Sequence, residues 1–183
     1  MSEQIDWSKA PEDPKTNLMR LIISLSEYMD DGRLIWSERV GKKDRAGLVV
    51  GSVNSSDGYR YAKCKGEKVG VHRVVFFMHH GYCPPEIDHI NRKRDDNRIE
   101  NLRDPVSHTN NLGNQSHQIG RSSRFKGVCW DKNRGKWSAA IKDDGKAVFL
   151  GRFSDEASAA IAYNNAATLK FGKYAHLNEV QNG

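Results

Sequence analysis

The stretch Ile87-Asp88-His89-Ile90-Asn91 is the centre of this sequence, and it is followed by Asn101-Leu102-Arg103 and by Asn110-Asn111-Leu112-Gly113-Asn114. An acid and an imidazole stand side by side on a short apolar segment. On a strand their side chains would point to opposite faces, although a bend there would let both address one group. Helical spacing places Asn110 and Asn114 one turn apart, with His117 a further turn along. The spacing predicts a small site of acid, imidazole and amides.

The chemistry of these residue types suits a divalent ion and a base. Carboxylate and amide oxygens bind Mg²⁺ or Mn²⁺, which few protein groups hold together with waters and substrate phosphate oxygens. An imidazole with an ordinary pKa of about 6.5 can take a proton from water near neutral pH. The pattern indicates metal-assisted phosphodiester hydrolysis, with the ring of His89 open to a duplex. These residues alone leave a structural role open, because loop asparagines usually cap turns.

Composition limits the class of protein. The chain has 183 residues with 37% hydrophobic content, which favours two small domains over one large core. No run of 18 apolar residues exists, and the first residues lack a secretion signal, so we expect a cytosolic protein without a membrane partner. Its three cysteines, Cys64, Cys83 and Cys129, are far apart and predict neither a disulfide framework nor a zinc knuckle.

Positive charge is concentrated in one block. Residues 120–152 carry nine Lys and Arg against three Asp and Glu, an excess as large as the +6 net charge of the whole chain. Such a basic stripe is a footprint for a polyanion, because neutralising phosphates releases counterions.

The first half alternates turns with short apolar runs. Residues 1–16 are polar and predicted to be disordered or loosely attached, and the spacing of Leu18 through Met29 predicts a helix that packs on the strands and helix after it, a partner helix being the alternative. A helix over Val71 to His80, ended by Gly81, should come after an antiparallel meander. The strands expected for the meander are Leu34-Ile35-Trp36, Gly47 to Val53, Tyr59 to Lys63 and Lys68 to Val71.

The second half has a different pattern. Gly120 to Ser123 reads as a flexible joint. Three strands are predicted beyond it, over Phe125 to Asp131, Lys136 to Lys142 and Lys146 to Phe153. Ser154 is the expected N-cap of an alanine-rich helix that ends near Phe171.

The central residues resemble those of the HNH homing endonucleases of phages, which have a ββα-metal fold. The resemblance runs from Val71-His72-Arg73 through Asp88-His89 and Asp96 to Arg103, reaches Asn114, and extends upstream through Tyr28 to Lys68. In that family a metal-binding Asp precedes the general-base His, an Asn follows 12 residues after the His, and a metal-binding Asn stands nine further on. Counting from His89 gives Asn101 and Asn110.

The resemblance implies a role for each of these residues. Asp88 and Asn110 would bind Mg²⁺ or Mn²⁺, His89 would be the general base, and Asn101 would hold the loop that orients His89. Asn114 is a secondary candidate on the ligand helix, and His117 is a DNA contact or a spectator. Some relatives carry His where this chain has Asn, which argues against a zinc-type site. Cleavage would leave 5′-phosphate and 3′-hydroxyl ends.

The basic module resembles the plant ethylene-response-factor (AP2/ERF) type of DNA-binding domain, which phage HNH endonucleases often carry after the nuclease. Phe125-Lys126-Gly127-Val128, Gly135 to Ile141, Val148 to Phe153, Ala162 to Ala167 and Ala175 to Asn178 carry the resemblance. A basic and aromatic sheet can lie in the major groove. The side chains expected to contact DNA are Arg124, Lys126, Trp130, Arg134, Lys136, Lys142, Phe149 and Arg152.

The base contacts of the plant domains do not transfer with the fold. Cys129, Ala140 and Ala147 stand where plant members have Arg, Glu and Arg. On composition alone, a solvated basic face over a core with buried tryptophans is an equal alternative.

We therefore expect an α+β protein, a ββα-metal (HNH) nuclease domain followed by a small three-stranded antiparallel sheet packed on one helix. The expected bounds are 1–29 for a polar segment and helix, 30–118 for the nuclease, 119–123 for a linker, 124–178 for the ERF-type domain and 179–183 for a tail. The expected function is site-selective cleavage of double-stranded DNA, with homing as its context. The sequence leaves open whether the protein is a monomer or a homodimer. A transcription regulator with an inactive nuclease domain is the alternative, and a structural or RNA-binding protein is a further one.

Overall fold

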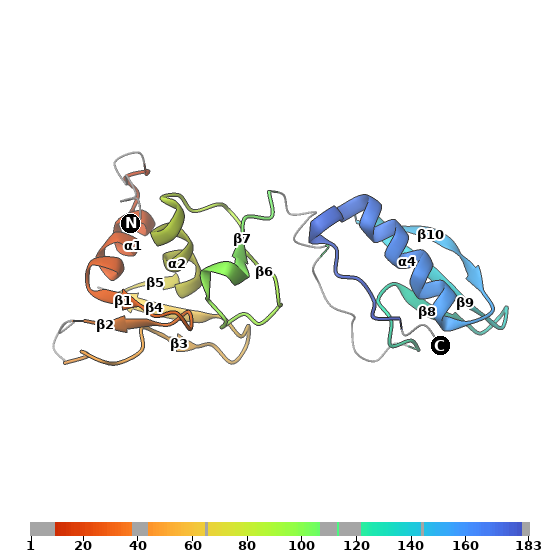
Figure 1. Cartoon of the computed structure of the whole chain (residues 1–183), viewed down its shortest axis with the longest axis horizontal. Coiled ribbons are helices and arrows are strands. Elements are labelled where there is room, and N and C mark those ends of the chain that lie inside the picture. Colours follow the sequence, from red (N-terminus) through yellow and green to blue (C-terminus); the bar gives the residue numbers. More distant parts are fainter. Residues whose placement is uncertain are drawn as a thin grey trace. The chain divides into compact units, whose positions relative to one another are not determined.

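The computed structural model describes residues 10–37, 44–64, 66–106, 113, 122–143 and 145–180. The chain divides into two compact units, residues 1–104 and 105–183 (Figure 1). The mixed α+β class is confirmed. The domain bounds expected from the sequence stay a prediction, because most of the segment around the expected linker lies outside the described residues.

The first unit contains two helices, a two-stranded hairpin, a three-stranded antiparallel sheet in the order β3-β4-β5, and a second two-stranded ladder. These elements are α1 (Pro14–Ser24), β1 (Ser26–Tyr28), β2 (Leu34–Trp36), β3 (Ser52–Val53), β4 (Arg60–Cys64), β5 (Glu67–Gly70), α2 (Val71–His80), β6 (Asp88–His89), the 3₁₀ helix η2 (Ile99–Asn101) and β7 (Leu102–Arg103).

Helix α1 begins earlier than the sequence suggested. The Asp13 side chain accepts hydrogen bonds from the backbone N–H groups of Lys15 and Thr16, and Pro14 occupies the first turn, where its missing N–H costs nothing. Ala10 and Thr16 are buried. The prediction that this segment is disordered or loosely attached is therefore wrong for residues 10–16.

The helix also ends earlier, at Ser24 rather than at Met29. The Ser26 hydroxyl donates to the carbonyl of Ile22, and Ser26–Tyr28 then pairs with β2 as strand β1. The apolar spacing continued past the helix because both elements bury residues in the same core. The strand predicted over Gly47 to Val53 is likewise shortened to β3, preceded by an isolated bridge between Val49 and Ile35.

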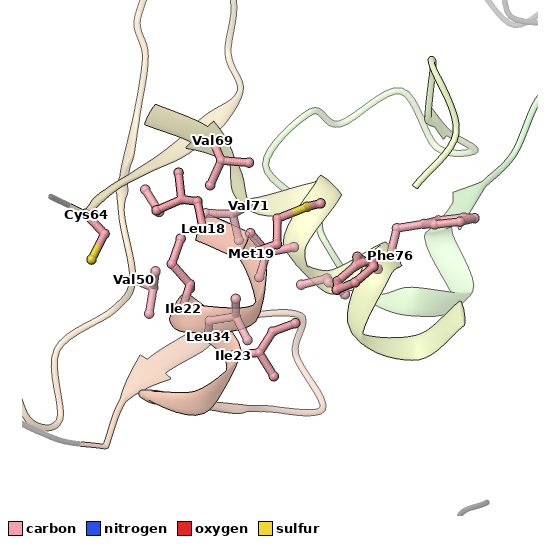
Figure 2. Packing of buried hydrophobic residues seen from close by; sticks show 14 of the residues in the cluster. Leu18, Met19, Ile22, Ile23, Leu34, Val50, Cys64, Val69, Val71 and Phe76 are labelled. Carbon is pink, nitrogen blue, oxygen red and sulfur yellow. The ribbon is translucent and has the colours of Figure 1, made fainter. Parts of the chain in front are cut away.

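The core of the first unit joins α1 to α2 and to the sheets, which confirms that the N-terminal helix packs on the elements after it. Figure 2 shows the side chains of α1 gathered with those of β2, β4, β5 and α2. The buried residues labelled there are Leu18, Met19, Ile22, Ile23, Leu34, Val50, Cys64, Val69, Val71 and Phe76. Burying this apolar surface is the main stabilising contribution to the unit.

Helix α2 has the predicted bounds and ends at Gly81, whose φ of 74° is left-handed. Near its start, the ring of His72 lies 4.9 Å from the ring of Tyr59, and its Nδ1 is buried without a hydrogen-bond partner among the described residues. Burial lowers the pKa of His72 to about 3, with a smaller contribution from the neighbouring His89. This imidazole is therefore neutral throughout the physiological range.

Gly32, in the turn between β1 and β2, makes a close approach to a distant loop. Its φ is +85°, and a Cβ built there would lie 2.3 Å from the backbone nitrogen of Arg98 and 2.7 Å from the carbonyl carbon of Asn97. Only glycine permits both the conformation and the contact. The β1–β2 hairpin thereby restricts the position of the backbone at Asn97 and Arg98.

The second unit is a three-stranded antiparallel sheet in the order β10-β9-β8, covered by one helix, as predicted (Figure 1). Buried alanines of the helix let it lie close to the sheet. The elements are β8 (Val128–Asp131), β9 (Lys136–Asp143), β10 (Lys146–Phe153), α4 (Glu156–Phe171) and the 3₁₀ helix η3 (Gly172–Tyr174).

Two details of this unit differ from expectation. The N-cap of α4 is Asp155 rather than Ser154, because the Asp155 carboxylate accepts the N–H of Ser158 at 2.7 Å. Ser122 and Ser123 are tied to the unit instead of forming a flexible joint. The Ser122 hydroxyl accepts the N–H of Trp130, and the buried Ser123 hydroxyl donates to Glu156.

Within the described residues, none of the helices has the length and apolar character needed to cross a membrane.

We expect Gly32→Ala to lower the free energy of unfolding by about 2 kcal/mol or more, because overlap with the Asn97–Arg98 backbone adds to the conformational cost. The matched control is Gly47→Ala, at a φ of +78° with nothing within 4 Å of the added Cβ. It should cost only about 1 kcal/mol. Urea denaturation measures both, and equal losses would contradict the close approach.

We expect His72→Phe to flatten the pH dependence of stability. The unfolded chain protonates this imidazole near pH 6.5 and the folded protein only near pH 3, so the wild type loses stability as the pH falls between these values. The variant lacks this loss, and its slope should be smaller by up to about 1.4 kcal/mol per pH unit. Urea denaturation across this range measures the slope, with the exposed His80 replaced as a control. An unchanged slope in His72→Phe would show that the folded ring ionises freely.

Candidate active site

The adjacent acid and imidazole lie on β6, which pairs with β7 in the register Asp88↔Arg103 and His89↔Leu102. Successive side chains of a strand point to opposite faces, so Asp88 and His89 leave this ladder on different sides. Asp88 is 5% exposed and His89 is 3% exposed. Both residues are therefore buried within the first unit.

Asp88 is held by Arg103, the residue directly opposite on β7. The Nε of Arg103 donates to Oδ2 of Asp88 at 2.7 Å, and Nη2 lies 2.6 Å from the same oxygen. The two side chains are 6% and 18% exposed. A buried carboxylate needs such a partner in place of water, and the contact with Arg103 fixes the direction of the Asp88 side chain.

The ring of His89 is oriented by Asn97, a residue that the sequence did not single out. Nε2 of His89 lies 3.2 Å from the amide oxygen of the buried Asn97. Because an amide oxygen only accepts, Nε2 carries the hydrogen and Nδ1 has the lone pair. Burial lowers the pKa of His89, against the opposing effects of the Asn97 hydrogen bond and the Asp88 charge. The ring is thus kept in the form that can accept a proton.

Aromatic rings complete the surroundings of His89. Its ring centroid lies 5.7 Å from that of Tyr59 and 5.5 Å from that of His72. The expectation of a ring open to a duplex is wrong for this structure, since His89 is only 3% exposed.

Asn101 braces the loop that follows His89. Its side-chain oxygen accepts the N–H of Asn91 at 2.9 Å, and its amide nitrogen donates to the carbonyl of Asp96 at 2.7 Å. Its own carbonyl accepts the N–H of Ile90. Both ends of the 91–96 loop are thus tied to one buried amide. This geometry supports the loop-holding role that the family resemblance implied.

The same loop is stiffened by charged groups. Arg98 donates to both carboxylate oxygens of Asp96, at 2.9 and 2.8 Å, and this pairing holds the pKa of Asp96 at about 2. The exposed Arg94 donates to the carbonyl of Asp57 and lies over the Tyr59 ring. A positive charge therefore stands beside the aromatic cover of His89.

The remaining predicted site residues, Asn110, Asn114 and His117, lie outside the described residues. In the described part of the chain, no group of three or more His, Cys, Asp or Glu side chains is placed to hold a metal ion. Of the two residues predicted to bind Mg²⁺ or Mn²⁺, Asp88 lies within the described residues and Asn110 does not.

The sequence did not identify three of these site residues, Arg103, Asn97 and Tyr59. Each of them is distant in sequence from the residue that it contacts, or is joined to it by a loop whose path cannot be predicted from the sequence. Arg103 could have been found if the pairing of residues 88–89 with residues 102–103 had been predicted. No regular spacing in the sequence pointed to Asn97.

The sheet of the second unit has two chemically different faces. Ala139 and Ile141 of β9 point toward α4 and are buried, together with Val128 of β8. The alternate residues make the outer face, which we define by Cys129, Lys136, Lys142, Ala147, Phe149 and Arg152. All six are exposed.

Arg152 is preorganised on this outer face. Its guanidinium lies 4.8 Å from the Phe149 ring, and its Nε donates to Asp131 at 2.9 Å. Phe149 itself is 54% exposed, which is unusual for a phenylalanine and favours stacking on a partner.

The other predicted DNA contacts are placed differently. Trp130 pairs with Trp137 in a T-shaped contact on the face that carries the core. The Nζ of Lys126 donates to the carbonyl of Gly113 within the same unit. Arg124 lies over the Phe125 ring and Arg134 lies near Asp131, both exposed. The outer face thus gathers four of the eight predicted residues, Lys136, Lys142, Phe149 and Arg152.

The first unit also has a groove of about 670 Å³ beside the β3-β4-β5 sheet. Arg45, Lys63 and Lys68 contribute positive charge to its lining, and the Lys68 ammonium lies 3.7 Å from the centroid of the Tyr61 ring. Basic and aromatic linings of this kind suit a nucleic-acid backbone.

Comparison with known proteins agrees with both of the families that the sequence resembled, the HNH endonucleases and the AP2/ERF-type proteins. Residues 69–104 match the HNH endonuclease family, a range that includes His72, Asp88, His89, Asn97, Asn101 and Arg103. No solved structure is significantly similar to the chain.

Several plant proteins are similar to about a third of the chain. The chain is 41% identical over 58 residues to APETALA2-like protein 2 of Oryza sativa subsp. indica, covering 32% of this chain and 13% of that protein. It is 40% identical over 60 residues to the AP2-like ethylene-responsive transcription factor TOE2 of Arabidopsis thaliana, covering 33% and 12%. A dehydration-responsive element-binding protein 2E of Arabidopsis thaliana matches at 38% over 68 residues, covering 30% and 26%. The chain thus spans only a small part of these relatives. It carries an HNH endonuclease domain over residues 69–104 and is distantly related to AP2/ERF-type proteins over about a third of its length.

Proposed function

We propose that this chain is a metal-dependent, site-selective DNA endonuclease of the homing type, which hydrolyses phosphodiester bonds. The observation that carries the proposal is the β6–β7 ladder inside the matched HNH region. It holds an ion-paired carboxylate, Asp88, next to a neutral imidazole, His89. Asn101 braces the adjoining loop from both ends.

Asp88 and Asn110 would hold Mg²⁺ or Mn²⁺. A single carboxylate with an amide fits these ions, which keep waters and bind substrate phosphates. When bound, the ion would offset negative charge on the phosphate and on the leaving oxygen. Asn114 and His117 remain secondary candidates for this end of the site, and Arg103 holds the Asp88 carboxylate in place.

His89 would take the proton of the attacking water at Nδ1, since Nε2 is committed to Asn97. The proton acceptor is ready at neutral pH because burial disfavours the charged ring. Water must reach this buried nitrogen during the reaction, so the proposal requires the cover of His89 to open when DNA binds. Attack on phosphorus would leave a 5′-phosphate and a 3′-hydroxyl.

The outer face of the second unit would bind double-stranded DNA and set the position of the cut. Lys136, Lys142 and Arg152 supply phosphate contacts, and Phe149 supplies an exposed ring. Tethering this module to the nuclease raises the effective concentration of DNA at the site. One site per chain gives a nick for each binding event, or paired cuts by two copies. We place this activity in the bacterial cytosol, in keeping with the resemblance to phage enzymes.

A second function is favoured by the burial of His89. A ring that is only 3% exposed fits a DNA-binding regulator whose nuclease domain no longer cleaves. The two functions share the DNA-binding module and differ only in the chemistry at β6.

Plasmid nicking by the full-length protein with Mg²⁺, and its loss with EDTA, separates the two functions. We expect His89→Ala to lower the cleavage rate by about 100-fold or more, the usual contribution of a general base, while duplex affinity stays nearly intact. His80→Ala, which removes an exposed imidazole from α2, is the control and should cleave like the wild type. Full activity of His89→Ala would refute the assigned base, and no Mg²⁺-dependent nicking by the wild type would favour the regulator.

The DNA-binding role of the outer face is tested by salt dependence. The double variant Lys136→Gln, Lys142→Gln should lower the slope of log affinity against log salt by up to about 0.9 for each phosphate that is no longer neutralised. Lys170→Gln is the matched control, because that ammonium pairs with Asp143. Fluorescence anisotropy with a labelled duplex measures the slope. An unchanged slope in the double variant would remove the outer face from the DNA interface.

A further inference from the structure

Asp88 and Arg103 form an ion pair across the β6–β7 ladder. Two nitrogens of Arg103 converge on one oxygen, Oδ2, at 2.7 and 2.6 Å, and the two side chains are 6% and 18% exposed. The pairing follows from the strand register, which places the two residues directly opposite each other. It is therefore built into the backbone and does not depend on flexible side chains meeting by chance.

This arrangement works against ion binding by the free protein. A divalent cation is attracted by the negative charge of its ligands. The negative charge of Asp88 is already offset by the positive guanidinium of Arg103. An ion at Asp88 would also stand close to the positive charge of Arg103, where little water screens their repulsion.

A DNA phosphate would supply the missing charge. Mg²⁺ and Mn²⁺ sites in phosphate-handling proteins commonly use one or two carboxylates and complete the shell with substrate oxygens. Once a phosphate reaches the site, its negative charge offsets both the ion and Arg103.

We propose that Arg103 makes metal loading conditional on DNA. By balancing the charge of Asp88, it keeps the affinity of the free protein for the ion low, and the bound phosphate completes the site. This inference rests on the proposed function, because it takes Asp88 as a metal ligand. By linkage, the ion and the duplex strengthen each other's binding by the same factor.

The test measures Mn²⁺ binding to the full-length protein without DNA, from the electron paramagnetic resonance signal of free Mn²⁺. Removing the positive charge in Arg103→Gln should tighten binding by about tenfold or more, through loss of repulsion. Arg103→Lys keeps the charge and is the matched control, with an affinity within about threefold of the wild type. Thermal unfolding gives a second readout, in which Mn²⁺ should raise the Tm of Arg103→Gln more than that of the wild type.

The Asp88→Asn variant separates failure of this inference from failure of the proposed function. If Asp88→Asn binds Mn²⁺ as the wild type does, Asp88 is not a ligand and the proposed metal site falls. If Asp88→Asn loses binding while Arg103→Gln binds no more tightly than the wild type, only the inference about Arg103 is overturned.

A measurement that leaves Arg103 intact covers the case in which Arg103→Gln does not fold. In His89→Ala, where cleavage is prevented, a short duplex of arbitrary sequence should raise the Mn²⁺ affinity by about tenfold or more, with binding to the duplex alone subtracted. No gain in affinity on adding the duplex would overturn the proposal.

Discussion

The site depends on a carboxylate that has been almost fully removed from water. Asp88 is 5% exposed, and its charge is stabilised by Arg103 from the opposite strand of the β6–β7 ladder. Removing one member of such a pair leaves an uncompensated buried charge, which typically costs about 3–5 kcal/mol. The ladder has only two residue pairs, and the ion pair therefore secures both its register and the direction of the Asp88 carboxylate.

Neutral amides orient the imidazole next to this charge. Asn97 fixes the tautomer of His89, and Asn101 ties the loop between them to the end of β6. Gly32 further restricts the position of Asn97, because the β1–β2 turn lies directly against the backbone of that residue. The hydrophobic core that joins α1, α2 and the sheets thus reaches the site through backbone contacts. The aromatic cover of Tyr59 and His72 keeps the ring neutral and restricts its access to water.

The sheet of the second unit has a buried face of small residues and an exposed basic face. Its core side is built from small residues, Ala139 against Ala159 and Ala160, which lets α4 lie close. The outer face keeps Lys136, Lys142 and Arg152 in solvent, with Phe149 exposed among them. In the proposed function, binding and chemistry can change independently, because the residues assigned to each belong to different units of the chain.

The sequence by itself determined the elements with strong local signals. Helix α2, ended by Gly81, the three strands of the second unit and the alanine-rich α4 were all predicted, because periodicity, turn residues and caps act over a few residues. The resemblance to HNH endonucleases likewise pointed to Asn101, whose side chain ties both ends of the adjoining loop. The ends of α1 were missed, since an apolar spacing that serves both a helix and a following strand does not mark where one becomes the other.

Only the tertiary structure decided what surrounds the acid and the imidazole. Arg103 reaches Asp88 through strand pairing, Asn97 reaches His89 through the path of a loop, and Tyr59 and His72 come from other elements. The burial of His89 follows from that packing, so no local pattern could show it. Neighbouring residues in the sequence show which chemical groups are present. The charge balance and solvent access of those groups are set by residues that meet only when the chain has folded.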